Sequence, residues 1–98
     1  MTSQYEFSAA DARRRRVRFR AWHRGTKEMD LILGSFADAH VATMDEADLD
    51  SLEALMQAPE QDAYGWITGA RPVPPDFDTP LMARLRRHTV PPRGRRER

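Results

Sequence analysis

Several residue types and patterns are missing from this chain of 98 residues, and each absence excludes some kinds of site or function. It has no cysteine, which excludes disulfides, thiolate metal sites and thiol chemistry, and which suits a reducing compartment. No apolar run approaches the ~20 residues that a membrane-spanning helix requires, so we expect no membrane insertion. Residues 1–7 are polar and lack the apolar centre of a secretory signal.

Recognisable catalytic machinery is also scarce. The histidines at positions 23, 40 and 88 show neither HxxxH nor HExxH spacing, so we expect no metal site. The glycines are too dispersed for a phosphate-binding loop, and no serine has a nucleophile-elbow context. Neighbouring acids such as Glu46 and Asp48 are typical of a helix N-terminus rather than of a general acid and base. The sequence therefore does not predict an enzyme.

Charge varies strongly along the chain, although the net charge is only +1. Residues 1–24 carry seven arginines against two acids, a net of +5, and residues 81–98 carry seven arginines against one acid, a net of +6. Residues 25–80 carry two basic residues against twelve acids, a net of −10. Such segregation is typical either of internal complementarity with a solvated basic tail or of a surface that steers a partner electrostatically.

Helical periodicity predicts an all-α fold, a compact single-domain bundle of five short helices. We expect the helices at residues 9–23, 26 or 27 to 41, 46–57, 60–68 and 80–88. No β-branched stretch with a period of two occurs, so strands are not expected. The bundle should occupy residues 9–90, between a flexible N-terminus (1–8) and a disordered arginine-rich tail (91–98).

Local signals mark the ends of these helices. Ser8, Asp45 and Thr79 are the expected N-caps, because their side chains can accept hydrogen bonds from the first turn. Gly25 and Gly69 are expected to end helices, since glycine adopts the left-handed conformation without a steric penalty. The segment 71–77 contains three prolines and is not expected to be regular.

The apolar residues at helical spacing define the expected core. These are Ala10, Val17, Ala21, Met29, Ile32, Leu33, Phe36, Ala37, Leu49, Leu52, Leu55, Met56, Trp66, Ile67, Leu81, Met82 and Leu85. We expect Tyr64 to pack against Trp66 and His40 to lie at the surface near a helix end. Trp22 precedes the connection between the first two helices and is a candidate for an exposed contact.

The segment from Arg24 to Asp30 is the most informative part of the chain and is expected to form a helix–helix corner. Gly25 permits a tight turn, Arg24 supplies a rigid fork of five donors, and Glu28 projects from the start of the next helix. One interpretation is structural, with an ion pair between Arg24 and Glu28 that pins the corner. The other is a patch that is presented to a partner.

The basic first helix allows an alternative function. Arg13 to Arg16, Arg18 and Arg20 are interleaved with Phe19 and Trp22, and such a surface could bind phosphates and stack bases. Against this, the central segment is acidic, and the pI of about 8.3 is low for a dedicated nucleic-acid domain. We expect no nucleic acid partner, and a basic-helix nucleic-acid binder or an antitoxin-like interaction module stays as the alternative.

A motif at the corner and the order of elements after it resemble those of a known family. The matching features are Arg-Gly-x-x-Glu (Arg24, Gly25 and Glu28), then Met29-Asp30 with an apolar helix to Phe36, an acid-capped leucine-rich helix (45–56), Trp66 with Gly69, and a proline-containing connection to the last helix. Over about residues 13–88 the chain resembles the succinate dehydrogenase assembly factor 2 family, also called FAD assembly factors or flavinators.

The resemblance implies an assembly role. Family members bind the flavoprotein subunit of succinate dehydrogenase or fumarate reductase, assist that subunit in attaching FAD to one of its own histidines through the flavin 8-methyl group, and then leave. The chain would then be no enzyme, would hold no cofactor stably itself and would act on the FAD of its partner. It would work as a monomer in a bacterial cytoplasm, or in the mitochondrial matrix if the source is eukaryotic.

The resemblance also implies a partner-binding site at the corner. Carried over residue by residue, the site comprises Arg24, Gly25 and Glu28, with Asp30 as a weaker candidate and with Arg20 and His23 beside them. His23 and Thr26 differ from the arginine and methionine that many members carry at these positions, which affects the fine contacts expected there.

Overall fold

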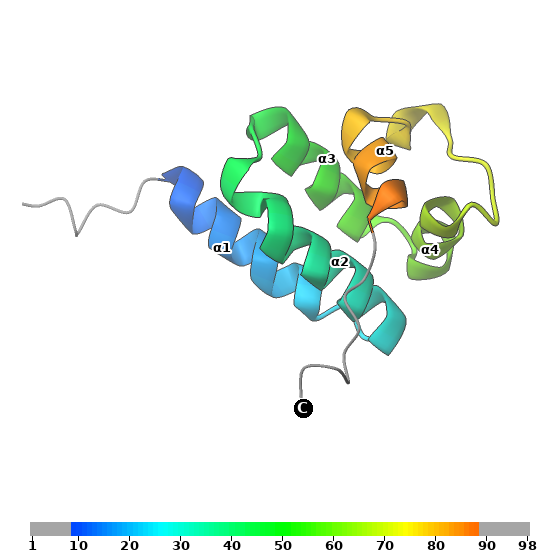
Figure 1. The fold of residues 1–98 in the computed structure, drawn as a ribbon, viewed down its shortest axis with the longest axis horizontal. Coiled ribbons are helices and arrows are strands. Elements are labelled where there is room, and N and C mark those ends of the chain that lie inside the picture. The colour runs from blue at the N-terminus through cyan, green and yellow to red at the C-terminus, as the bar shows by residue number, and fades with distance from the viewer. Residues whose placement is uncertain (1–8, 89–98) are drawn as a thin grey trace, which may run out of the picture.

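The computed structural model describes residues 9–88, and helices are the only regular secondary structure in this part of the chain. The elements are α1 (Ala9–Trp22), α2 (Lys27–His40), η2 (Val41–Thr43), α3 (Glu46–Gln57), α4 (Glu60–Thr68), η3 (Pro75–Phe77) and α5 (Pro80–Arg87). The five α-helices form one bundle, which confirms the predicted fold class (Figure 1). The expected cap Ser8 and the two terminal segments lie outside the described residues.

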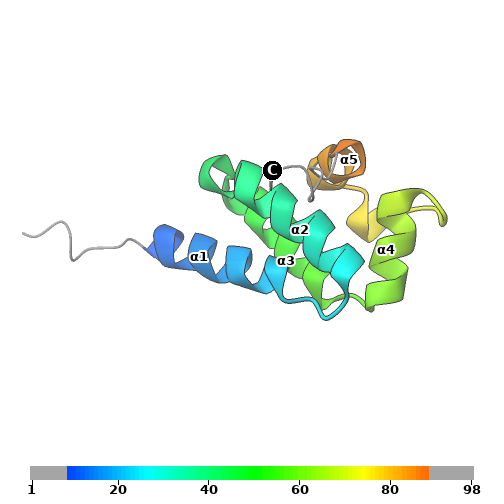
Figure 2. The same cartoon turned by 60° about the horizontal axis from the view of Figure 1, so that its bottom comes forward.

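The helices are arranged around an antiparallel hairpin of α1 and α2, which lie side by side in both views (Figures 1 and 2). The third helix, α3, packs against α1, and α5 packs against both α3 and α4. The start of α4 lies beside the connection between α1 and α2 (Figure 2). The corner between α1 and α2 therefore lies next to the junction of α3 and α4, although these segments are about thirty residues apart in the sequence.

One apolar cluster forms the core and contains almost all of the expected positions. Its buried members are Val17, Ala21, Met29, Leu33, Phe36, Ala37, Val41, Met44, Leu49, Leu52, Leu55, Met56, Ala63, Trp66, Ile67, Leu81, Met82 and Leu85. Ala10 and Ile32 are only half-buried, and Ile32 packs against the edge of this cluster. Burial of this apolar surface is the main favourable contribution to folding.

The predicted helix ends at Asp45, Gly69 and Thr79 are confirmed. Asp45 accepts a hydrogen bond from the Asp48 backbone N–H at 2.9 Å, and Thr79 accepts one from the Met82 backbone N–H at 3.1 Å. Gly69 ends α4 in the left-handed conformation, with φ of 86°. Each cap satisfies a backbone group that a helix terminus would otherwise leave unpaired.

The structure corrects three aspects of the expected course of the chain. The first, second and fifth helices end one residue earlier than predicted, at Trp22, His40 and Arg87. The turn η2 follows α2 directly, because the chain tightens before it enters the extended backbone at Met44. The proline-rich segment is not wholly irregular, since the fixed φ of proline suits the first position of the short turn Pro75–Phe77.

Three aromatic rings also lie differently from expectation. Trp66 stacks on Phe77, with ring centroids 4.6 Å apart, whereas Tyr64 is exposed and is not its ring partner. Trp22 is half-buried because Gly34 has no side chain and leaves room for the indole. His40 is half-buried against Phe36, with centroids 4.6 Å apart, and is not a free surface residue.

Candidate functional site: the corner between α1 and α2

The connection between α1 and α2 is a tight turn whose backbone is bound by Asp30. The Asp30 carboxylate accepts hydrogen bonds from the backbone N–H groups of Arg24, at 2.6 Å, and Gly25, at 3.1 Å. Gly25 has φ of +113°, a conformation that residues with a Cβ rarely adopt. Hydrogen bonds to a charged acceptor are among the stronger ones, so Asp30 shapes the corner.

The side chain of Arg24 points into the protein and not toward Glu28. Its Nη2 atom donates to the backbone carbonyl of Met56 in the last turn of α3, and its Nε atom is buried without a hydrogen-bond partner among residues 9–88. A cation near the C-terminal carbonyls of a helix is favoured by the helix dipole. The structural interpretation, an ion pair between Arg24 and Glu28, is therefore wrong. The Arg24 side chain attaches the corner to α3 instead.

Thr26 attaches the corner to α4. Its hydroxyl accepts a hydrogen bond from the Met29 backbone N–H at 3.3 Å, as an N-cap of α2, and donates to the Glu60 carboxylate at 2.5 Å. Sequence reasoning did not assign either residue to the site. The position of Thr26 between Gly25 and the apolar helix is a signal for the cap, whereas no local pattern points to Glu60, 34 residues away.

Glu28 is the carboxylate that the corner presents to solvent. It lies in the first turn of α2, where the positive end of the helix dipole favours an acid. Its side chain is exposed, and among the described residues it takes part in no hydrogen bond or ion pair. It lines an open hollow of about 260 Å³ together with Thr26, Met29, Glu60, Gln61 and Tyr64.

Arg20 and His23 lie on the last turn of α1 and just beyond it. His23 is exposed, its Nδ1 atom lies 2.6 Å from the Phe19 carbonyl oxygen, and its ring stacks on that of Phe19. Arg20 is half-buried on the side toward α3, where its charge acts on Glu53. The six predicted site residues thus divide into a frame that shapes and attaches the turn (Arg24, Gly25 and Asp30), the exposed Glu28 and His23, and the half-buried Arg20.

Much of the arginine run in α1 is used inside the molecule. Arg13 is only 17% exposed and forms ion pairs with three acids of α3, namely Glu46, Asp50 and Glu53. Hydrogen bonding to Arg13, and to a smaller extent the charges of Arg13 and Arg20, holds the pKa of Glu53 below its usual range. Part of the charge segregation is therefore internal complementarity between α1 and α3.

Two further arginines of α1 reach toward α2 and η2. Arg14 donates from Nε to the Val41 carbonyl at 3.0 Å and from Nη2 to the Met44 carbonyl at 2.5 Å. Arg18 pairs with Asp38 of α2 at 3.0 Å. These side chains stabilise the hairpin and the turn after it. Fewer arginines than the sequence indicated are left for a partner.

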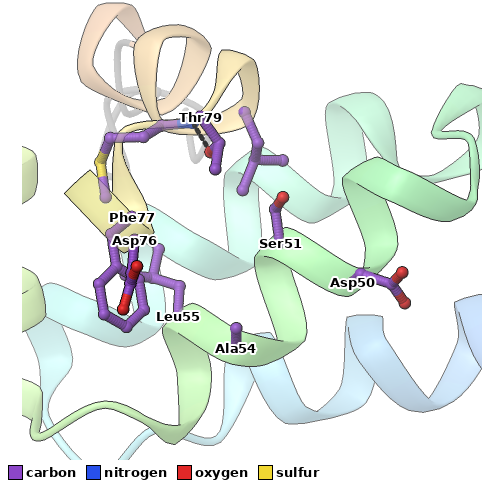
Figure 3. A pocket seen from close by; sticks show the side chains of 9 residues that line it. Asp50, Ser51, Ala54, Leu55, Asp76, Phe77 and Thr79 are labelled. Atoms are coloured by element: carbon purple, nitrogen blue, oxygen red, sulfur yellow. Dashed lines mark hydrogen bonds between the residues drawn. The ribbon is translucent and has the colours of Figure 1, made fainter.

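A second hollow, of about 200 Å³, lies between α3, η3 and α5 (Figure 3). Its apolar lining includes Leu55, Phe77, Leu81 and Met82, and its polar lining includes Asp50, Ser51, Asp76 and Thr79. In the close-up view, Asp76 and Phe77 lie on one side of it and Asp50 on the other (Figure 3). None of the corner residues lines this hollow, so the two features are separate.

The part of the chain that the structure describes shows neither a metal-binding group nor a membrane-spanning helix. Residues 9–88 contain no group of three or more histidine, cysteine or acidic side chains that could hold a metal ion. Within the same range, none of the helices has the length and apolar character needed to cross a membrane.

Comparison with known proteins supports the resemblance seen at the corner. A family model described as "Flavinator of succinate dehydrogenase" matches residues 15–89, which include the corner and most of every helix. The chain belongs to this flavinator family. The predicted family resemblance is confirmed.

Relatives of this flavinator chain occur in a bacterium and in eukaryotes. It is 39% identical over 74 residues to the FAD assembly factor SdhE of Acetobacter pasteurianus, covering 76% of this chain and 68% of the relative. It is 31% identical over 83 residues to the mitochondrial succinate dehydrogenase assembly factor 2 of Dictyostelium discoideum, covering 85% of this chain and 59% of the relative. For the Drosophila grimshawi protein of that name the identity is 32%, and the chain covers 53% of it.

Proposed function

We propose that this chain is an assembly factor that binds the flavoprotein subunit of succinate dehydrogenase and promotes the covalent attachment of FAD to it. Membership of the flavinator family supports the connection with succinate dehydrogenase. The observation that carries the proposal is the exposed carboxylate of Glu28, which has no partner among the described residues and stands on a turn that is held from three sides.

The frame of the corner makes this surface suitable for binding. Asp30 fixes the turn, Arg24 attaches it to α3, and Thr26 attaches it to α4. A preorganised surface loses less conformational entropy on binding than a mobile loop does. Glu28 therefore reaches a partner in one orientation, and its binding energy favours the partner conformation that complements it.

We further propose that the chain acts through conformation and not as an acid or base. Glu28 is exposed on a turn that Asp30 and Arg24 hold in place, a position that suits contact with the surface of a partner. The corner would instead hold the flavoprotein in an arrangement in which its own histidine meets the flavin. On this account the chain binds no FAD stably by itself.

The same proposal extends to partners, assembly state and compartment. Fumarate reductase is a second client, because a corner that presents one carboxylate would recognise any flavoprotein that carries the complementary surface. The chain acts as a monomer. It works in the bacterial cytoplasm, or in the mitochondrial matrix if its source is eukaryotic, as the bacterial and mitochondrial relatives suggest.

Covalent flavin on the succinate dehydrogenase flavoprotein tests this function. Cells that lack the chain are complemented with the wild-type chain or with empty vector, and flavin fluorescence is measured in a denaturing gel. We expect covalent flavin to be low without the chain and restored with it. Equal covalent flavin in both strains, with equal amounts of the flavoprotein, would overturn the proposal.

A further inference from the structure

The outer side of α1 carries an aromatic pair among arginines. Phe19 is 63% exposed, and its ring stacks on that of His23 with centroids 4.0 Å apart and an angle of 19° between the planes. Two open hollows of about 430 and 450 Å³ flank Phe19. The first is lined by Arg15, Arg18, Phe19, Trp22, His23 and Asp38, and the second by Ala12, Arg15, Arg16, Phe19 and Arg20.

The spacing of these residues places them on one side of the helix. Positions 12, 16, 19 and 23 follow each other at intervals of three and four, so their side chains form one stripe. Three other arginines of α1 are bound inside the molecule instead: Arg13 to α3, Arg14 to η2 and Arg18 to α2. On the stripe, Arg16 is exposed, and its side chain forms no hydrogen bond or ion pair within residues 9–88.

We infer that this α1 face (Arg15, Arg16, Phe19 and His23) binds an acidic segment of a partner protein that places an apolar side chain against Phe19. Arginine forks match carboxylates in geometry and charge. Aromatic residues and arginines also dominate the binding energy of protein interfaces. An exposed phenylalanine between two hollows gives such a segment an apolar contact at the centre of a charged rim.

Charge distribution favours a protein partner over a nucleic acid. The stripe from position 12 to position 23 is only ~17 Å long, at ~1.5 Å for each helical residue. Residues 25–80 carry a net charge of −10, so a continuous polyanion that extends past the stripe would meet a repulsive body. The Phe19–His23 pair also offers one stacking platform, where single-strand binders use several. A short acidic protein segment ends within the face and avoids this repulsion.

This inference rests on the proposed function, because the flavoprotein subunit is the partner that would carry the acidic segment. His23 is the residue directly before Arg24, so the α1 face is continuous with the corner. We assign the two surfaces different tasks. The α1 face provides affinity, and the corner presents Glu28 to the site of flavin attachment.

The test measures affinity and flavin attachment separately, with the full chain and the purified FAD-free flavoprotein subunit. Three variants are compared with the wild-type chain. The first is the double variant Phe19→Ala/Arg16→Ala, and the second is Glu28→Ala. The third, Arg87→Ala, is a control that removes an exposed arginine from α5. Affinity is measured by titration calorimetry at low and at moderate salt. The rate of covalent flavin attachment is then measured with the chain at a saturating concentration.

We expect the double variant to bind at least about tenfold more weakly, with a smaller salt dependence, and to recover the wild-type flavin attachment rate at saturation. Arg87→Ala should bind as wild type does. If the double variant binds with wild-type affinity while Glu28→Ala binds more weakly, the inference about the α1 face is wrong and the proposed function stands. If the wild-type chain binds a single-stranded RNA probe but not the flavoprotein, both proposals fail.

Discussion

The indole ring of Trp22 lies directly against the backbone of Gly34, so that a Cβ atom placed at Gly34 would be 2.2 Å from Cδ2 of Trp22. The indole Nε1 atom also donates to the Asp38 carboxylate at 3.2 Å, one turn further along α2. This contact brings α1 and α2 close together just before the corner. It therefore sets the direction in which Arg24 and Gly25 leave the first helix.

Gly34→Ala should destabilise the protein by about 1–3 kcal/mol, because the added methyl group overlaps a ring that is held in place. In an open helix the same change is favourable by ~1 kcal/mol. Gly65→Ala is the comparison variant, since its Cβ would lie 2.9 Å from Cδ of Arg71, whose largely exposed side chain can shift more easily than the packed indole. Urea unfolding measures both, and equal stability of the two variants would contradict the importance of the Trp22 contact.

Asp30→Ala should destabilise the corner by about 1.5–3 kcal/mol, because it removes the charged acceptor of two backbone N–H groups. Asp30→Asn keeps an oxygen acceptor and should lose less. The free energy of unfolding and the hydrogen exchange rates of the Arg24 and Gly25 amides report the effect. Unchanged exchange of these amides in Asp30→Ala would show that another group holds the turn.

The ion pairs of Arg13 should make stability depend on pH in the acidic range. Hydrogen bonding to Arg13 holds the pKa of Glu53 below the 4.5 of an unperturbed carboxyl, so the unfolded chain binds the proton first as the pH falls. The contribution of Glu53 is thus present above about pH 4.5 and is lost as the pH falls through its folded pKa.

Glu53→Gln should lower the melting temperature at neutral pH and flatten its fall in acid. Melting temperatures between about pH 3 and pH 7 give the comparison. Parallel curves for the variant and the wild type would show that Glu53 titrates alike in both states.

His88 should contribute a second pH dependence, closer to neutrality. Burial and the nearby charge of His40 lower its pKa below 6.5, and its Nε2 atom lies 2.8 Å from the Ser35 hydroxyl. The folded state therefore disfavours the imidazolium, so this stability is present above about pH 6.5 and declines as the pH falls through the folded pKa. NMR titration of the His88 ring, with His88→Asn to assign it, checks the direction, and a pKa above 6.5 would contradict it.

The helices and their caps could be predicted because their signals are local. The stripe of Met29, Leu33 and Phe36 has a period that only a helix places on one face, and it is buried as expected. Asp45 and Thr79 stand beside the amides that they cap. The positive φ of Gly25 likewise follows from a glycine between two helical patterns.

The roles within the corner could not be predicted, because they depend on contacts between distant parts of the chain. Nothing in the sequence shows that Arg24 reaches Met56, 32 residues away, or that Thr26 reaches Glu60. These contacts decide that Arg24 belongs to the frame while Glu28 stays exposed. The family motif names both residues but does not separate the two roles.

The central claim is that the exposed carboxylate of Glu28 acts on the flavoprotein partner. Its most direct test is the rate of covalent flavin attachment to the purified flavoprotein subunit, with wild-type chain, Glu28→Ala, Glu28→Gln and the exposed acid control Asp76→Ala.

We predict that Glu28→Ala slows attachment about tenfold or more, a loss of ~1.4 kcal/mol or more. Its own free energy of unfolding should fall by no more than ~1 kcal/mol, the usual size of a helix-dipole interaction, so the variant stays folded. Glu28→Gln, which keeps its acceptor oxygen but cannot transfer a proton, should retain the rate, as should Asp76→Ala. A wild-type rate with folded Glu28→Ala would contradict the account.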